Sequence, residues 1–387
     1  MRLKGNAVAI LVIGIFSSAT VIGSTYDKIR SNIMSSCDKD TGKSSGGAKS
    51  SSKGNDKTSG VAQQKNLVTL DQLKSYNKVP KGQYNQLNRH LRGGSRPFDI
   101  DDPQIHANDG RLVLNSAETL TFRAFSPHAY FTSTKSSKRS DQARVMVLPK
   151  KRYHGISDFI DHASDDEISL YFKELYDSIV KVRSQYRDAS GASVPAGYRF
   201  LAKHSSLNGN NANMGGDRHL HTHVITGHAL PAIFNGKQPK DFDGLRKDIS
   251  DNIIATMLLP ESASSKKTVQ LIAYRVPKNY LSSSPVNLTS VRDVIGFTLQ
   301  GHDLSSLMKN RSDLLVKLFK FMRYVISTHF QALDQEGYAI VTDANDAKLQ
   351  GFKLKDGPTE AFVAGSTTIF ALGDGSYIPT ESLIKPS

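Results

Sequence analysis

The chain has 387 residues, of which 38% are hydrophobic and one is a cysteine, and it carries a formal net charge of +14 at pH 7. This length accommodates one large domain or two ordinary ones, and the single cysteine excludes an intramolecular disulfide and a multi-cysteine zinc site. The positive charge favours anionic partners. The basic loop at residues 135–139 has no interleaved aromatic side chain, which predicts a solvated loop and no specific nucleic-acid partner.

The N-terminal region is predicted to be a targeting segment followed by a linker. Arg2 and Lys4 precede an apolar run that can extend over residues 7–23, with small residues near its end. This order is typical of a secretory signal, and the uncleaved run would be near the minimum length of a membrane anchor. We therefore expect a signal peptide or signal anchor at residues 1–23 and a secreted or membrane-anchored, extracytoplasmic protein. Residues 24–66 are rich in Ser, Gly and Lys and predict a disordered linker.

Residues 67–110 show no recognisable pattern and stay unassigned, so ordered structure is predicted to begin near Leu112. Strands are predicted at residues 112–114, 119–125, 144–148 and 197–202, followed by a Gly/Asn-rich turn at 208–216. Between the third and fourth strands, residues 165–186 predict a helix with Ser164 as its N-cap. Its apolar side chains recur at helical spacing: Ile168, Leu170, Tyr171, Leu175, Ile179 and Val182.

Three alternating histidines follow the turn, in the sequence His219-Leu220-His221-Thr222-His223-Val224-Ile225. In a β-strand these imidazoles would share one face, roughly 6.6 Å apart, while the residues between them face a core. Imidazole can act as nucleophile, acid, base or metal ligand near neutral pH. Burying three imidazoles on one face without a use would be costly. The segment is therefore the main candidate site.

The second half of the sequence follows a similar order. Residues 269–280 resemble 145–153, because each is a strand that ends in Pro-Lys with a tyrosine just after. A helix is predicted at 313–333, and residues 337–341 match the Gly-Tyr strand that begins at Gly197. Ala361–Ser366 falls where the histidine strand would be and contains no histidine. The pattern predicts a duplication, and therefore an intramolecular pseudo-dimer rather than an obligate homodimer.

The histidine pattern, in this context, resembles the histidine triad (HIT) superfamily of nucleotide hydrolases and transferases. The context is a strand that ends in Pro149-Lys150-Lys151, then a helix, a Gly-Tyr strand and an Asn/Gly turn. Ser126–Ala129 also resembles the Asn-Pro-x-Ala turn of that family. The resemblance implies an α+β fold, an antiparallel sheet with packed helices. It implies a histidine-triad domain at residues 111–236 and a degenerate half without the triad at 237–387.

The resemblance also implies chemistry at the α-phosphate of a nucleotide or nucleoside phosphate derivative, with no required metal or cofactor. His221 would be the nucleophile and would form a nucleotidyl-histidine intermediate. His223 would contact the phosphate and the leaving group, and His219 would hold His221 in its reactive tautomer. The nucleotide-binding residues implied are Asn210, Asn211, Gly215, Gly216, Phe122 and Phe125.

Two departures keep other functions open. Arg152 stands where the family often has a histidine, and Asp217 lies where the family usually has a Gln-Ser pair. A carboxylate there would repel a phosphate, which would favour a non-catalytic nucleotide- or partner-binding protein. A third possibility is a metal-dependent hydrolase or nuclease, with His204 or His228 as a further zinc ligand. Otherwise these two residues, His154 and His162 are expected on the surface or in loops.

Overall fold

The computed structural model describes residues 66–87, 112–123, 143–185, 197–204, 207, 219–226, 233–235, 239–262, 264–283, 287–345, 362–363 and 365–373. The predicted signal segment, and all of the predicted linker except its last residue, lie outside these ranges. Within them, no helix combines the length and apolar character needed to cross a membrane.

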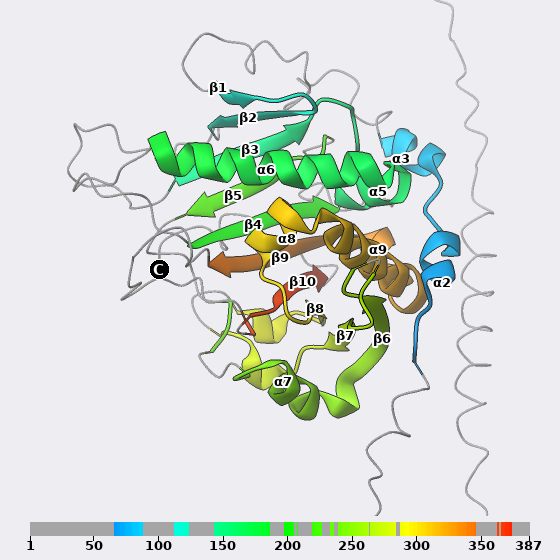
Figure 1. Ribbon diagram of the computed structural model, residues 1–387. Coiled ribbons are helices and arrows are strands. Elements are labelled where there is room, and N and C mark those ends of the chain that lie inside the picture. The colour runs from blue at the N-terminus through cyan, green and yellow to red at the C-terminus, as the bar shows by residue number, and fades with distance from the viewer. Residues whose placement is uncertain are drawn as a thin grey trace, which may run out of the picture. The chain divides into compact units, whose positions relative to one another are not determined.

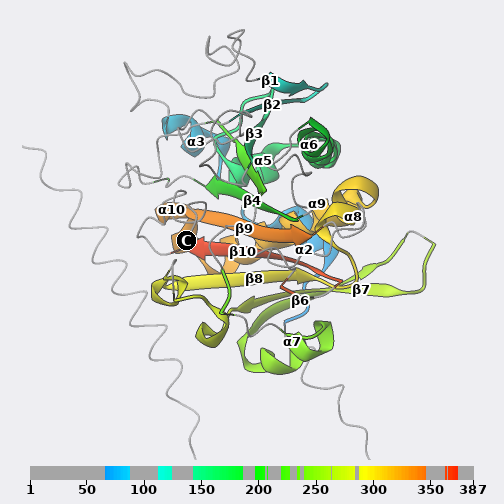
Figure 2. The ribbon, with the colours of Figure 1, turned by 90° about the vertical axis from the view of Figure 1, so that its left-hand side faces the viewer.

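In the part of the chain that the structure describes, ten strands form one antiparallel sheet, which confirms the predicted α+β class. The first half contributes β1 (Leu112–Asn115), β2 (Thr119–Arg123), β3 (Ala143–Pro149), β4 (Gly197–His204) and β5 (Thr222–Thr226). The second half contributes β6 (Ile253–Pro260), β7 (Thr268–Arg275), β8 (Asp293–Leu299), β9 (Tyr338–Asn345) and β10 (Thr367–Gly373). The strand order is β1-β2-β3-β5-β4-β9-β10-β8-β7-β6, and Figure 2 shows the strands following one another from β1 to β6 and β7.

Helices α6, α8 and α9 lie across one face of the sheet (Figure 1). The helices are α2 (Leu70–Ser75), α3 (Lys81–Leu87), α5 (Ile156–His162), α6 (Asp165–Gln185), α7 (Phe242–Asp248), α8 (Leu304–Asn310), α9 (Ser312–His329) and α10 (Gln331–Glu336). Short 3-10 helices occupy Ser250–Asn252, Lys278–Tyr280 and Leu288–Ser290. The predicted N-cap of α6 is confirmed: Ser164 Oγ accepts from the Glu167 amide at 3.1 Å, and the Ser164 amide donates to Glu167 Oε2 at 2.8 Å.

The main core lies between these helices and the sheet. Phe172 of α6 stacks on Phe319 of α9 with ring centroids 4.6 Å apart, and Phe200 of β4 lies beside both rings. Most of the apolar residues predicted for the α6 core face are buried, but Leu170 is 37% exposed. It is two positions, or about 200°, around the helix from the buried Ile168, and so faces solvent.

The order of the strands in the second half mirrors the order in the first half. From one edge the strands run β1-β2-β3-β5-β4, and from the other β6-β7-β8-β10-β9, and the halves meet where β4 pairs with β9. Paired residues form one unbroken row across the sheet: Leu112, Phe122, Met146, His223, Leu201, Val341, Phe370, Gly296, Tyr274 and Ile253. Opposite residues in paired strands point to the same face, so these side chains share one side of the sheet.

The predicted correspondence between residues 269–280 and 145–153 is wrong, because the two strands occupy different positions in the mirrored sheet order. The strand within 269–280 is β7, second from its edge as β2 is, whereas the place of β3 belongs to β8. A Pro-Lys turn after a strand is a local signal, and it does not specify which partners the strand pairs with. The strand predicted at Ala361–Ser366 is also displaced, because β10 begins at Thr367.

Replacing Gly296 with alanine is expected to destabilise the protein by about 1–3 kcal/mol, because the site has no room for a methyl group. A Cβ there would lie 2.5 Å from Cζ of the buried Tyr274 ring. Urea unfolding of Gly296→Ala measures the loss. Gly82→Ala is the control, since its added Cβ meets nothing within 4 Å. Equal unfolding free energies for the two variants would contradict the packing argument.

Candidate active site

The three histidines of the candidate site are all buried, with 3%, 6% and 5% exposure for His219, His221 and His223. The ladder of β5 begins at Thr222, so only His223 lies within the strand. The predicted alternation is nevertheless confirmed: Leu220 and Val224 belong to the main core. Thr222 Oγ1 also faces that side and forms a 2.7 Å hydrogen bond with a tyrosine hydroxyl on α6. The histidines therefore face away from α6.

Two backbone carbonyls set the ring orientations. His219 Nε2 lies 2.7 Å from the Pro149 carbonyl, and His221 Nδ1 lies 3.0 Å from the His219 carbonyl. A carbonyl oxygen only accepts, so both ring nitrogens donate. In a neutral His221 ring, Nε2 then carries the lone pair. The His223 ring lies beside it, with centroids 4.7 Å apart and planes at 87°.

The sheet places one predicted pocket residue on the histidine face. Phe122, Met146 and Leu201 share the row of His223, and Phe122 is fully buried. Phe122 is two strands from His223, or about 9.6 Å at the usual strand spacing. The other predicted nucleotide-binding residues lie outside the described residues: Asn210, Asn211, Gly215, Gly216 and Phe125. The same holds for Ser126–Ala129, Asp217 and His228, so their roles stay predictions.

The two lysines of the Pro-Lys-Lys turn bond within the fold. Lys150 Nζ donates to the Ser116 carbonyl at 2.5 Å, and Lys151 Nζ lies 2.6 Å from Glu167 Oε1. The hydrogen bond from Lys151 lowers the pKa of Glu167 to about 2. Lys151 therefore links the end of β3 to the start of α6, and Lys150 links it to the turn between β1 and β2. Part of this contact was readable beforehand, since Glu167 lies in the first turn of the predicted helix.

In the mirrored strand order, β10 of the second half corresponds to β5 of the first, so its residues can be compared with the histidines. Tyr198 and Tyr338 each follow a glycine. When these two tyrosines are aligned in sequence, Leu201 aligns with Val341, and these two residues also pair directly between β4 and β9. His223 pairs with Leu201 and Phe370 pairs with Val341, so Phe370 takes the place of His223.

By the same register, Thr368 and Ser366 take the places of His221 and His219. Phe370 packs on Phe234 and Phe362, with centroids 5.0 and 5.3 Å away. Thr368 Oγ1 bonds to a threonine hydroxyl on β8 at 2.9 Å, and Ser366 Oγ accepts from a backbone amide at 3.3 Å. In the second half, a packed phenyl ring and bonded hydroxyls therefore occupy the sheet positions that imidazoles occupy in the first half.

His204 lies on the opposite face of the sheet from the histidines. It follows Phe200 and Ala202 on the core side of β4, whereas Leu201 faces the histidine side. Across the described ranges, no group of three His, Cys, Asp or Glu side chains is placed to hold a metal ion. The expectation that His204 lies on the surface or in a loop is wrong, since it lies in β4 and is 1% exposed. His154 lies in the loop between β3 and α5, as expected, but it is only 5% exposed. Both pack around Tyr84 of α3, which belongs to the extension left unassigned from sequence.

The burial of His204 predicts a loss of stability in mild acid. Its Nε2 donates to the Asp334 carbonyl at 3.0 Å, and burial lowers its pKa. Below about pH 6.5 the unfolded chain binds a proton that the native His204 does not, so stability falls as the pH falls, by up to about 1.4 kcal/mol per pH unit. Urea unfolding between pH 7.5 and 5 measures this slope. His204→Gln is expected to flatten it, and an unchanged slope would contradict the assignment.

Comparisons with known proteins add little to this geometry. No family model matches the chain, and no curated protein sequence matches it. One similar solved structure is the X-ray structure of a GalT-like protein from Arabidopsis thaliana. It is 11% identical with a TM-score of 0.38, and the match covers 68% of this chain and 77% of that chain. A TM-score of this size supports no assignment of fold or activity.

Proposed function

We propose that the chain is a histidine-triad-type nucleotide hydrolase or nucleotidyltransferase. It acts at the α-phosphate of a nucleoside phosphate derivative through a covalent intermediate on His221. The observation that supports this most is the hydrogen bond from His221 Nδ1 to the His219 carbonyl, which in a neutral ring places the lone pair on Nε2. A nucleophile needs an unprotonated atom held in one orientation, and this contact supplies both.

The geometry suggests how the step would run. His221 Nε2 attacks the α-phosphorus, and the bond from phosphorus to the leaving group breaks. The ring becomes cationic, and the His219 carbonyl stabilises that charge through the Nδ1 proton. His223, 4.7 Å away, is placed to contact the phosphate and the leaving group. Water or another acceptor then displaces His221. Positioning and charge stabilisation dominate such transfers.

The proposal includes a tandem origin for the two halves, which would pair as a pseudo-dimer within one chain. The mirrored strand order supports this, as does the pairing of the matched residues Leu201 and Val341 at the seam. Truncation after about Lys237 is then expected to expose the β4 edge and to produce dimers or aggregates. Size-exclusion chromatography with light scattering measures the outcome. A soluble monomer would count against the pseudo-dimer.

Intact mass spectrometry tests the reaction. The full chain is incubated with a panel of adenosine phosphoramidates, beside His221→Ala and His221→Gly. A nucleotidyl adduct or turnover that disappears in both variants is expected. Bound nucleotide with neither adduct nor turnover would favour a non-catalytic binding protein, and absence of both binding and turnover would direct attention to metal-dependent chemistry. The secreted or membrane-anchored location stays a separate prediction.

A further inference from the structure

Residues 66–87, here called the strap, run from the outer strand of the second half to α5 in the first half. The strap begins as a short parallel bridge on β6: the Val68 amide donates to the Thr256 carbonyl at 2.7 Å, and the Thr256 amide donates to the Asn66 carbonyl at 2.9 Å. Val68 and Leu73 are buried in the main core. The strap is therefore part of the fold, although its sequence predicted no structure.

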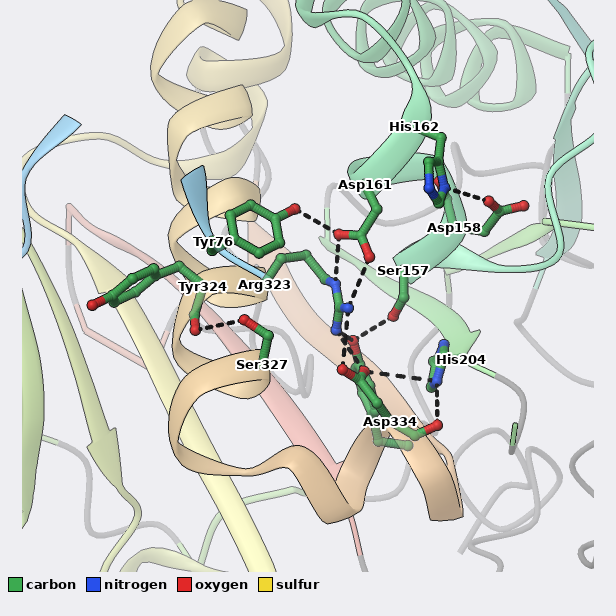
Figure 3. A network of polar contacts seen from close by, with 11 residues as sticks. Tyr76, Ser157, Asp158, Asp161, His162, His204, Arg323, Tyr324, Ser327 and Asp334 are labelled. Carbon is green, nitrogen blue, oxygen red and sulfur yellow. Dashed lines mark hydrogen bonds and ion pairs between the residues drawn. The ribbon is translucent and has the colours of Figure 1, made fainter. Parts of the chain in front are cut away.

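The middle of the strap is fixed to a buried charge network. Tyr76 donates to Asp161 Oδ1 at 2.5 Å, and Asp161 also accepts two hydrogen bonds from Arg323 (Figure 3). Asp161 belongs to α5 and Arg323 to α9, so this contact joins the strap to helices of both halves.

The end of the strap inserts one ring among three histidines. Tyr84 of α3 is 1% exposed. Its ring is parallel to His154 at a centroid distance of 6.4 Å and perpendicular to His162 and His204 at 5.9 and 6.0 Å. Lys81, one turn earlier, places Nζ 5.9 Å from the centroid of the Tyr153 ring. The strap thus packs on residues 153–154.

The segment from Pro149 to Gly155 also holds the histidines. The Pro149 carbonyl accepts from His219 Nε2 at 2.7 Å, and the Tyr153 carbonyl accepts from the Leu220 amide at 2.6 Å. Gly155, at φ 145°, forms a bridge with β4. The same short segment therefore contacts the strap through its side chains and the histidines through its carbonyls.

We propose that the strap positions the histidine triad through residues 149–155, with Tyr84 as the positioning residue. The catalytic consequence rests on the proposed function, but the physical coupling does not. Among the described residues the Tyr84 hydroxyl has no hydrogen-bond partner, so the ring supplies the contact. Loss of the ring lets residues 153–154 move, and the Leu220 amide, which belongs to the peptide bond between His219 and Leu220, moves with the Tyr153 carbonyl that it bonds.

Amide hydrogen exchange and steady-state kinetics on the full chain test the coupling. Tyr84→Ala is expected to speed exchange of the Leu220 amide about tenfold or more relative to amides of β9. It is also expected to lower kcat by about 10- to 100-fold with little change in KM, because small misplacements of a reacting group are costly. Tyr84→Phe is expected to behave as the unmodified chain. Leu73→Ala is the matched control, a buried strap residue that is expected to leave Leu220 exchange unchanged.

Two results would overturn the coupling. Wild-type exchange at Leu220 in Tyr84→Ala would show that the strap does not hold the segment. Equal acceleration in Tyr84→Ala and Leu73→Ala would show that the strap acts only through global stability. If the unmodified chain shows no turnover, the proposed function fails, while the exchange comparison still decides whether the strap holds the histidine segment.

Discussion

Replacing Arg323 with methionine is expected to lower the free energy of unfolding by about 3–5 kcal/mol. The Arg323 side chain is fully buried and bonds both Asp161 oxygens, at 3.0 and 2.9 Å. It also bonds Asp334 Oδ1 at 2.7 Å and the Tyr338 hydroxyl at 3.1 Å. Removing the cation leaves two carboxylates buried without their counter-ion, and Tyr76 of the strap loses a fixed acceptor (Figure 3).

Urea unfolding of the variant measures this loss, with Arg275→Met as the matched control. Arg275 pairs with Asp293 at 2.5 Å, but its side chain is 55% exposed, so its loss is expected to cost about 1 kcal/mol or less. Neutralising both carboxylates, in Arg323→Met with Asp161→Asn and Asp334→Asn, is expected to recover part of the loss. If Arg323→Met costs no more than Arg275→Met, the network contributes little net stability.

Replacing His221 with glycine is expected to lower kcat/KM by about 10⁴-fold or more, which corresponds to ~5.5 kcal/mol in activation free energy. The physical reason is loss of the only atom proposed to bond to phosphorus. His223→Ala keeps that atom and removes a phosphate contact, so a smaller loss of about 10²- to 10³-fold is expected.

Steady-state kinetics with the best substrate of the phosphoramidate panel measure both values. Circular dichroism and unfolding curves serve as the control for folding. A His221→Gly variant within tenfold of the unmodified chain, or a larger loss in His223→Ala, would place the nucleophile elsewhere.

Local signals predicted much of the first half. The Ser164 N-cap of α6, the alternation around Thr222 and the two Gly-Tyr strands all correspond to observed elements. The sequence analysis did not predict β8, and it placed the last strand at residues 361–366, just before the observed β10. Six of the seven residues of β8 and all seven of β10 are buried, so neither strand shows the alternation that reveals a half-exposed strand.

The strap escaped prediction for a different reason. Its helices have six and seven residues, too few for a hydrophobic period and too short to be stable without docking. His204, whose burial the sequence did not predict, packs beside Tyr84 of the strap. At the candidate site, the histidine spacing was readable, but the tautomer of His221 depends on a backbone carbonyl that any residue could supply.

Phe370 in the place of His223 has a consequence for stoichiometry. A dimer of identical histidine-triad halves would hold two sites that could influence each other, whereas this sheet carries imidazoles on one side of the β4–β9 seam and a phenylalanine cluster on the other. Under the proposed function, each chain binds one nucleotide, saturation is hyperbolic with a Hill coefficient of about 1, and half-of-sites behaviour does not arise. The two halves are then expected to tolerate different substitutions. In the strand with Phe370, substitutions are limited only by how the side chain packs. In the segment with His221, they are limited by the reaction.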